Sequence, residues 1–369
     1  MKPGIYIGLM SGTSLDGVDA VLADLSDGIS VRAHQHRPFA PALRAELLAL
    51  NRCGANELHR SALAGNALAR AYADAVHAVL REAGLGPQAV TAIGAHGQTV
   101  RHRPGEFDAC GYTIQVLNAA LLAELCAIAI VADLRSRDLA AGGQGAPLVP
   151  AFHRALFARQ GVTIGVLNLG GIANLTVLGA DGATIGFDCG PANALMDHWC
   201  ERHRGMAFDA AGAWAARGRV DDPLLEAMLA DAFFAKLPPK STGRDRFNPE
   251  WLAAHLQAAP AATPQDVQAT LAELTARTAS SALMRHAPGA RELLVCGGGA
   301  LNAHLMARLG ALLPSCSVLP TDARGLPALQ VEAAAFAWLA KAHCEHRPGN
   351  LPSVTGAAGP RVLGAFYPS

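Results

Sequence analysis

The chain contains few charged residues and no excess of either sign. Of its 369 residues 16% are charged, and 30 Lys and Arg are balanced by 30 Asp and Glu. Aromatic residues make up 5%, and no stripe of basic residues interleaved with aromatics is visible. Because binding to nucleic acid needs a basic surface, this composition argues against a nucleic-acid partner.

The eight cysteines are scattered, and none of them forms a CxxC pair. This pattern is typical of reduced thiols in a cytoplasmic enzyme rather than of a disulfide framework or a zinc site. The longest apolar run, residues 119–132, contains Glu124 and is too short to cross a bilayer. The N-terminus leads straight into a strand and shows no signal peptide. We therefore expect a cytoplasmic protein with no membrane partner.

Hydrophobic residues are plentiful, at 51% of the chain, and the length exceeds what one core usually supports. A strand, a glycine-rich turn and an antiparallel return strand are predicted over residues 5–25 and again over 162–178, which suggests two copies of one fold. The glycine- and proline-rich segment 140–147 is the best boundary signal. We predict an N-terminal α/β domain over residues 1–135, joined by the C-terminal segment 350–369, and a C-terminal α/β domain over 136–349.

The first glycine-rich turn lies between the strands predicted at residues 5–9 and 18–25. Its small residues and free amides suit an anion, because a glycine backbone can approach phosphate closely. The hydroxyls of Ser11, Thr13 and Ser14 can donate to phosphoryl oxygens, and Asp16 or Asp19 can hold a magnesium ion through water. Taken alone, the same residues also fit an ordinary solvent-facing hairpin turn.

Two further glycine turns follow buried strands, at residues 168–171 and 296–302. The second is predicted to open a helix that runs through Leu309, and the amides at a helix N-terminus point outward toward a bound anion. Neither turn matches a dinucleotide-binding or Walker motif.

Several motifs occur in one order along nearly the whole chain, namely GLMSGTSLDGVD (8–19), HGQT (96–99), AGGQGAPLVP (141–150), NLGGIANLT (168–176), FDCGPANALMD (187–197) and CGGGALN (296–302). Together with the helix that carries Glu332, they closely resemble the anhydro-N-acetylmuramic acid kinases. The resemblance implies two related domains of the actin, hexokinase and Hsp70 type, with an active-site cleft between them. It also implies ATP, Mg²⁺, a small-molecule sugar substrate and a homodimer.

The resemblance implies residues that bind the ATP phosphates or pack on the adenosine: Ser11, Gly12, Thr13, Ser14, Leu15, Asp16, Gly17, Val18, Asp19, Asn168, Gly170, Gly171, Gly297, Gly298, Gly299 and Asn302. It implies residues that line the sugar site: His96, Gln98, Thr99 and one or both of Arg135 and Arg137. Either arginine could bind the lactyl carboxylate or form a surface ion pair instead.

Two carboxylates are the candidate catalytic groups. Asp188 follows a strand and precedes a Gly-Pro turn, where it could cap the helix beginning at Pro191 or, as the resemblance implies, act as general base. Glu332 lies on an apolar helix face with Leu329, Phe336 and Leu339, so it must meet a buried cation, for example Arg324, or contact the sugar.

The implied reaction hydrolyses the 1,6-anhydro bond and phosphorylates O6, giving N-acetylmuramic acid 6-phosphate and ADP. The chain departs from the family pattern at Cys189 and Ala192, where Thr and Gly are usual; both residues are small, so the turn should be kept. An ordinary sugar hydroxyl kinase and a nucleotide-switched binding protein are the alternatives, and the chain has no spare segment for a client-binding domain.

Overall fold

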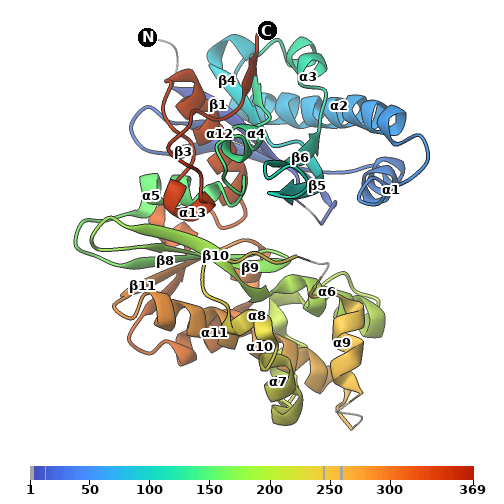
Figure 1. Ribbon diagram of the computed structural model, residues 1–369, viewed down its shortest axis with the longest axis vertical. Helices are drawn as coiled ribbons and strands as arrows, with labels where there is room; N and C mark the ends of the chain where they lie inside the picture. The colour runs from blue at the N-terminus through green and yellow to red at the C-terminus, as the bar shows by residue number, and fades with distance from the viewer. Residues whose placement is uncertain (1–3, 13, 244–245, 258–260) are drawn as a thin grey trace. The chain divides into compact units, whose positions relative to one another are not determined.

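The computed structural model describes residues 4–12, 14–243, 246–257 and 261–369, and it divides into two compact units (Figure 1). Unit 1 comprises residues 1–152 and 330–369, and unit 2 comprises residues 153–329. The first boundary falls within α5 (Val149–Phe157). The predicted boundaries at 135/136 and 349/350 therefore differ from those of the structure.

Unit 1 is built on a six-stranded sheet in the order β13-β7-β4-β1-β2-β3. Strands β1, β2 and β3 pair antiparallel in succession, whereas β4 and β7 lie parallel beyond β1. A separate two-stranded sheet joins β5 to β6. The strands are β1 (Ile5–Met10), β2 (Gly17–Asp24), β3 (Ser30–Pro38), β4 (Ala92–Ala95), β5 (Gln98–Pro104), β6 (Gly111–Val116), β7 (Ile130–Ala132) and β13 (Ala365–Tyr367).

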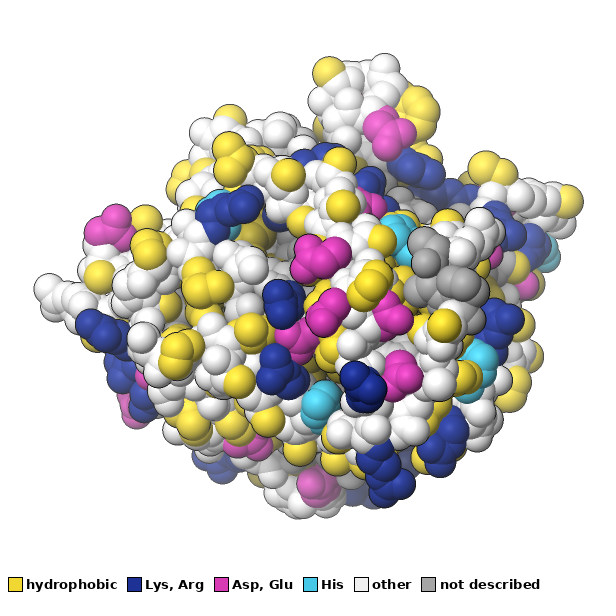
Figure 2. All heavy atoms as spheres, turned by 90° about the horizontal axis from the view of Figure 1, so that it is seen from below, with side chains coloured by type: hydrophobic (Ala, Val, Ile, Leu, Met, Phe, Trp, Pro, Cys, Tyr) yellow, Lys and Arg dark blue, Asp and Glu magenta, His cyan; other side chains and the backbone are white. Residues whose placement is uncertain are grey.

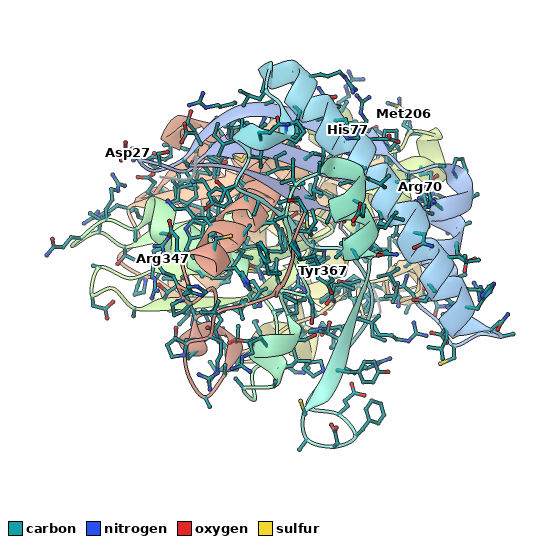
Figure 3. All side chains as sticks on the ribbon, turned by 90° about the horizontal axis from the view of Figure 1, so that it is seen from above. Asp27, Arg70, His77, Met206, Arg347 and Tyr367 are labelled. Carbon is teal, nitrogen blue, oxygen red and sulfur yellow. The ribbon has the colours of Figure 1, made fainter. Side chains whose placement is uncertain are left out.

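Helices cover both faces of this sheet. The long helix α2 packs on β2 and β3 (Figure 1), and its outward side carries Arg70 and His77 (Figure 3). The helix that contains Glu332 packs on β1 and β4. The helices are α1 (Pro41–Ala49), α2 (Glu57–Ala83), α3 (Ala119–Cys126), α4 (Ser136–Leu139), α12 (Val331–Cys344) and α13 (Pro352–Thr355), with a short 3₁₀ turn η1 (Pro87–Ala89).

Two glycines explain why α12 belongs to unit 1. A Cβ atom on Gly8 of β1 would overlap the carbonyl oxygen of Ala333, and one on Gly94 of β4 would overlap that of Phe336. The helix backbone therefore lies directly on the sheet at these two positions, which no larger residue permits. Because α12 packs on this sheet, the chain rejoins unit 1 at residue 330. The predicted return segment, 350–369, begins too late.

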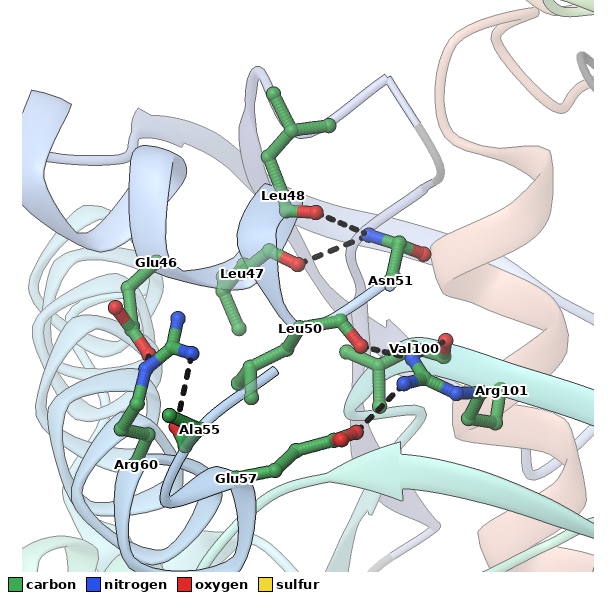
Figure 4. A network of polar contacts seen from close by, with 10 residues as sticks. All are labelled: Glu46, Leu47, Leu48, Leu50, Asn51, Ala55, Glu57, Arg60, Val100 and Arg101. Atoms are coloured by element: carbon green, nitrogen blue, oxygen red, sulfur yellow. Dashed lines mark hydrogen bonds and ion pairs between the residues drawn. The ribbon is translucent and has the colours of Figure 1, made fainter. Parts of the chain in front are cut away.

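A buried arginine ties the β5 strand to the connection between α1 and α2 (Figure 4). Arg101 donates to the Leu50 carbonyl oxygen and pairs with Glu57 at 2.6 Å. Nearby, Arg60 pairs with Glu46 at 2.7 Å. Because the guanidinium of Arg101 is largely removed from water, its hydrogen bonds hold this corner of the unit in place.

Unit 2 repeats the strand order of unit 1. Its sheet runs β10-β9-β8-β11-β12, with β8, β9 and β10 antiparallel in succession and β11 and β12 parallel beyond β8. The strands are β8 (Ile164–Leu169), β9 (Ile172–Leu178), β10 (Thr184–Pro191), β11 (Glu292–Cys296) and β12 (Ser317–Pro320). The predicted duplication is thus confirmed at the level of topology.

The helices of unit 2 bury one face of this sheet. Helix α10 packs on β9 and β10, and the core there includes Phe187, Cys189, Leu167 and Leu169. The helices are α6 (Asn193–Arg204), α7 (Asp222–Leu229), α8 (Ala232–Ala235), α9 (Pro249–Leu256), α10 (Pro264–His286) and α11 (Ala303–Leu312), with the 3₁₀ turns η2 (Ala210–Gly212), η3 (Ala215–Arg217), η4 (Gly298–Leu301) and η5 (Thr321–Arg324).

Surface charge agrees with the balanced composition. On the face seen in Figure 2, basic and acidic side chains are intermixed among the described residues, and neither sign dominates. Within the described part of the chain, no helix is long and apolar enough to cross a membrane.

Candidate active site

The turn between β1 and β2 contains the first predicted phosphate loop. Ser14 Oγ donates to Asp16 Oδ1 at 2.6 Å, and the Gly17 amide donates to the same oxygen at 3.1 Å. Leu15 has a left-handed backbone with φ of 57°, which makes the turn tight. Gly12 and Asp16 are accessible there, and Thr13 lies outside the described residues. The turn therefore leaves Ser14 and Asp16 accessible to solvent.

Ser11 does not fit the predicted phosphate-binding role. Its hydroxyl is 2% exposed, donates to the Gly97 carbonyl oxygen at 3.2 Å and lies 2.7 Å from Tyr72 Oη. Because its proton is given to Gly97, the hydroxyl accepts from Tyr72 and has no proton left for a phosphoryl oxygen. Ser11 therefore fixes the base of the turn.

Val18 and Asp19 lie on β2 beyond the turn. Val18 is buried in the core of unit 1, so its side chain is structural. Asp19 Oδ1 lies 3.2 Å from His34 Nε2 and 3.1 Å from His36 Nδ1, both on β3. Of the two predicted magnesium ligands, Asp16 is thus the exposed one in the turn, whereas Asp19 is engaged by two imidazoles.

His96 and Arg135 form a buried polar pair in unit 1. Arg135 donates to His96 Nε2 at 2.9 Å and to the Gly145 carbonyl oxygen at 2.8 Å. On the other side of the ring, His96 Nδ1 lies 3.3 Å from the Ser11 carbonyl oxygen. Burial, and after it the charge of Arg135, lower the pKa of His96 to about 3. The imidazole is therefore neutral and donates from Nδ1 to Ser11 while its Nε2 accepts from Arg135.

Glu332 lies on the first turn of α12, half-buried, within the electrostatic reach of Arg135. Burial lowers the pKa of Arg135 to about 10, whereas Glu332 and Asp138 act to raise it. Arg135 is thus a cation whose charge interacts with that of Glu332. The predicted partner, Arg324, instead binds Glu292 at 2.7 Å. Leu329 precedes the helix and is 47% exposed, so it does not share an apolar face with Glu332.

The remaining predicted sugar-site residues differ in their surroundings. Gln98 is 1% exposed and donates to the Gly12 carbonyl oxygen at 3.1 Å, so it supports the turn between β1 and β2. Thr99 Oγ1 accepts from Gln115 at 3.1 Å. Arg137 is exposed. Of the two arginines considered for the lactyl carboxylate, only Arg135 lies in the buried polar group with His96 and Glu332.

Asp138 is a buried carboxylate that the sequence analysis missed. It accepts from Asn350 at 2.7 Å and Thr355 at 2.8 Å through Oδ1, and from the Gly145 amide at 2.8 Å through Oδ2. The glycine-rich segment 140–147 is therefore tied to the C-terminal return of unit 1. It is not the boundary that its composition suggested, because its polar groups are satisfied within one unit.

In unit 2, the predicted second phosphate loop and the third glycine turn pack together. A Cβ atom on Gly299 would meet Leu169, and one on Gly297 would meet Asn168 and Leu169. The amide of Asn193 donates to the Gly170 carbonyl oxygen at 3.0 Å, which fixes the turn between β8 and β9. The structure thus brings together Asn168, Gly170, Gly171 and Gly297–Gly299.

Asn302 has a structural role at the third turn. The residues after Gly297 form the 3₁₀ turn η4, so the continuous helix predicted through Leu309 begins only at Ala303. The Asn302 side chain caps it by accepting from the Leu305 amide at 3.0 Å.

Asp188 lies in a row of polar side chains across the face of the sheet opposite the core. Strand register aligns Asp188 on β10 with Asn174 on β9, and Asn174 with Asn168 on β8. Phe187 and Cys189 alternate with Asp188 and point into the core. Asn168 is a predicted ATP ligand, so strand pairing places the candidate base and this ligand on one face. A β-bulge after Asp188 re-aims the chain there.

The carboxylate of Asp188 is held by two donors that the sequence analysis missed. Asn174 Nδ2 donates to Oδ1 and the Thr242 amide to Oδ2, both at 2.8 Å. Burial raises the pKa of Asp188, although these two bonds and the charge of Lys240 lower it. The capping alternative is wrong, because Ala192 is the N-cap of α6 and no side chain caps that helix.

Comparison with known proteins decides the family. The model of the family described as anhydro-N-acetylmuramic acid kinase matches residues 4–369. The chain belongs to that kinase family. A relative named anhydro-N-acetylmuramic acid kinase from Variovorax paradoxus is 61% identical, with all of both chains covered. One of the same name from Cupriavidus pinatubonensis is 58% identical over 98% of each chain.

Among solved structures, the activator of the 2-hydroxyisocaproyl-CoA dehydratase from Clostridium difficile aligns with a TM-score of 0.47 at 12% identity, covering 92% of this chain and 97% of that one. The kinase family and the duplicated strand order identify the fold as α/β, with two related units of the actin, hexokinase and Hsp70 type.

The two departures from the motif of this kinase family leave its backbone intact. Cys189 points into the core of unit 2, away from the polar row. The Ala192 amide donates to the Gly171 carbonyl oxygen at 3.1 Å, a bond that needs no particular side chain. The turn after Asp188 is kept, as the sequence analysis expected.

Proposed function

We propose that this chain hydrolyses the anhydro bond of 1,6-anhydro-N-acetylmuramic acid and phosphorylates O6, with ATP as phosphate donor. The observation that carries the proposal is the half-buried carboxylate of Asp188, oriented by Asn174 and Thr242 in the same polar row as Asn168. The products are N-acetylmuramic acid 6-phosphate and ADP, which assigns the enzyme to the recycling of cell-wall peptidoglycan.

Asp188 acts as the general base. It takes a proton from the water that attacks C1, the bond between C1 and O6 breaks, and O6 attacks the γ-phosphorus as ADP leaves. The raised pKa of the carboxyl makes it a stronger base than an ordinary aspartate. A positioned base contributes about 10²–10⁴-fold to rate, and the alignment of ATP and sugar supplies the rest.

Glu332 and Arg135 serve the sugar from unit 1. Glu332 orients the attacking water or stabilises positive charge near C1, since glycoside hydrolysis passes through an oxocarbenium-like transition state. Arg135, held by His96 and Gly145, binds the lactyl carboxylate, because guanidinium matches carboxylate geometry. The exposed Arg137 is the weaker candidate for that contact.

The proposed nucleotide ligands lie in the three glycine-rich turns. Ser14, Asp16 and the amides of the β1–β2 turn contact phosphate, together with Gly170 and Gly171, while Gly297–Gly299 pack on the adenosine. Among the described residues, no group of three or more His, Cys, Asp and Glu could hold a metal. Mg²⁺, which neutralises phosphate charge in such reactions, is therefore held mainly by ATP and water, with Asp16 as the protein ligand that fits.

Mass spectrometry of the sugar, after incubation with Mg-ATP in ¹⁸O-labelled water, tests the proposal. The expected product is heavier by one phosphate and one water, and carries the label at C1. A gain of phosphate without water would indicate an ordinary hydroxyl kinase and would remove the proposed role of Asp188. ATP binding without any sugar product would indicate a nucleotide-switched binding protein.

The assembly and location of the enzyme complete the proposal. A homodimer in the cytoplasm is expected from the family resemblance and from the scattered cysteines, which persist in the structure as eight free thiols. Sedimentation of the purified chain tests the dimer, and cell fractionation tests the location. A monomer at micromolar concentration, or recovery in the membrane fraction, would contradict this part.

A further inference from the structure

Unit 2 contains a pocket behind β10, the strand that carries Asp188. Its volume is about 290 Å³, close to the size of small-molecule sites. One wall is a face of α10 made by Thr278, Ser281, Ala282 and Arg285, which are spaced as neighbours along a helix. Because Cys189 lines the pocket and points away from the polar row, the pocket lies on the opposite face of the sheet from Asp188.

Three basic side chains converge on this pocket: Lys240, Arg285 and His286. None of the described residues that line it carries a carboxylate. Across the described chain, no ion pair joins Lys240 or Arg285 to an acidic residue. The charge of Asp188 acts on Lys240 from the other face of the sheet. Within the pocket, Lys240 and Arg285 repel each other, and an anion between them relieves that repulsion.

The titration of these groups reflects the crowding. The pKa of Lys240 is lowered, mainly by burial; Cys189 and Asp188 act to raise it, and the charge of Arg285 acts to lower it. Burial also lowers the pKa of His286, with added effects of Arg285 and Lys240. Lys240 Nζ lies 4.7 Å from the centre of the Phe233 ring, and its hydrogen bonds to the carbonyl oxygens of Phe233 and Phe234 are long, at 3.4 and 3.5 Å. Its ammonium can therefore turn toward a stronger acceptor.

The other walls are apolar or carry hydroxyls. Leu229, Phe234 and Ala282 offer hydrocarbon surface, and Thr278 and Ser281 offer hydroxyl donors. A bare anion would leave the apolar part uncovered, whereas an organic phosphate would fill both parts. We propose that this pocket binds a small phosphorylated organic compound, with its phosphate between Lys240, Arg285 and His286.

The pocket is linked to the candidate base by one short segment. The Asp188 amide donates to the Lys240 carbonyl oxygen at 3.1 Å, and the Thr242 amide holds Asp188 Oδ2 at 2.8 Å. A phosphate on Lys240 would also offset a positive charge that lowers the pKa of Asp188. Ligand binding is therefore expected to move the acid limb of the activity profile to higher pH. This consequence rests on the proposed function, whereas binding itself does not.

Isothermal titration calorimetry on the full chain tests the pocket, with glucose 6-phosphate and inorganic phosphate as probes. Glucose 6-phosphate is expected to bind at least tenfold more tightly than inorganic phosphate, since only it contacts the apolar wall. Arg285→Glu and Ser281→Asp are each expected to weaken it at least about tenfold, because each places a carboxylate beside the phosphate. Both positions are exposed, so both variants should fold.

Arg202→Glu is the matched control, since it makes the same charge change at an exposed position on α6 and should bind like the parent chain. The proposal would be overturned if Arg285→Glu bound the probe with unchanged affinity. It would also be overturned if neither probe bound at a concentration of about 10 mM. Equal affinity for both probes would overturn the claim that the ligand is an organic phosphate. Because calorimetry needs no turnover, these results stand apart from any failure of the kinase reaction.

Discussion

The turn after the first strand of each sheet differs between the two units, although the strand order is the same. In unit 1 the residues 11–16 separate β1 from β2, and the turn carries hydroxyl and carboxylate side chains. In unit 2 only Gly170 and Gly171 separate β8 from β9, and α6 holds their carbonyl groups. The turn of unit 1 thus carries polar side chains, whereas the turn of unit 2 consists of glycine backbone alone.

The helix that covers each sheet also differs. In unit 1, α12 lies directly on Gly8 and Gly94, backbone against backbone. In unit 2, a Cβ on Gly165 would instead meet the side-chain ends of Leu283 at 2.7 Å and Leu293 at 2.9 Å. Topology alone therefore does not place the candidate catalytic carboxylates. A close helix positions Glu332 in unit 1, and an edge strand with a bulge positions Asp188 in unit 2.

The largest expected effect separates the roles of these two carboxylates. Asp188→Asn should lower kcat by about 10²–10⁴-fold, because the variant cannot accept a proton from water. Its KM for ATP should change little. Glu332→Gln should cost less, since it keeps a polar group of the same shape beside Arg135. Steady-state kinetics of both variants decide the point, and a greater loss in Glu332→Gln would move the base to unit 1.

The next effect concerns how closely each helix approaches its sheet. Gly94→Ala should destabilise the protein by about 3 kcal/mol or more, since the new methyl overlaps a helix carbonyl that cannot move alone. Gly165→Ala should cost about 1 kcal/mol, because flexible leucine ends can shift. Urea denaturation gives both values. Gly310→Ala is the control: it lies within α11 with open space around it and should stabilise by up to about 1 kcal/mol.

Equal losses at Gly94 and Gly165 would contradict this difference between the units. The comparison would then rest on the turns alone, and the early return of the chain to unit 1 would need another cause.

A third test compares one buried histidine from each unit. The pKa of His96 and that of His153 are both lowered to about 3, mainly by burial. Below about pH 6.5 the unfolded chain binds protons at these sites and the folded chain does not, so stability is lost as pH falls from 6.5 toward 3. Each site should cost up to about 1.4 kcal/mol per pH unit in that window.

Melting temperatures of His96→Gln and His153→Gln between pH 7 and 5 check this expectation. Each variant should melt less steeply with falling pH than the parent chain. Unit 1 also holds His102, whose pKa is lowered to about 4 by burial and then by Arg135, so acid unfolding should begin in unit 1. A parent melting temperature that does not change over this range would contradict the neutral state of both rings.

Local patterns predicted most strands of both sheets, but contacts distant in sequence decided the rest. Strand β9 lies at the predicted residues 172–178 because it is apolar and bounded by glycine turns. Strand β3, at residues 30–38, was missed because it is a polar edge strand. The segment 140–147 resembles a linker by composition, yet Asp138 satisfies it from within unit 1.

The residues of the candidate site also fall into those that the local sequence predicts and those that contacts distant in sequence bring in. The glycine turns, Asp188 and Glu332 were predicted as site residues because their motifs resemble those of the kinase family. Asn174 and Thr242 were missed, since only strand pairing and the β10 bulge bring them to Asp188. Ser11 was assigned to phosphate because a hydroxyl in a glycine turn has the same sequence appearance whether it faces outward or inward.

The smallest predicted effect tests that reassignment of Ser11. Ser11→Ala should destabilise the protein by about 1–3 kcal/mol, because the buried hydroxyl of Tyr72 loses its acceptor. Its KM for ATP should stay within about twofold. Adding Tyr72→Phe should recover part of the loss, since removing both partners leaves no buried donor unpaired.

Ser14→Ala should have the opposite effects. It should leave stability unchanged and raise the KM for ATP, because the Ser14 hydroxyl lies in the accessible part of the turn. A rise in KM for Ser11→Ala at constant melting temperature would instead show that Ser11 faces the nucleotide, and both turns would then need to be compared again.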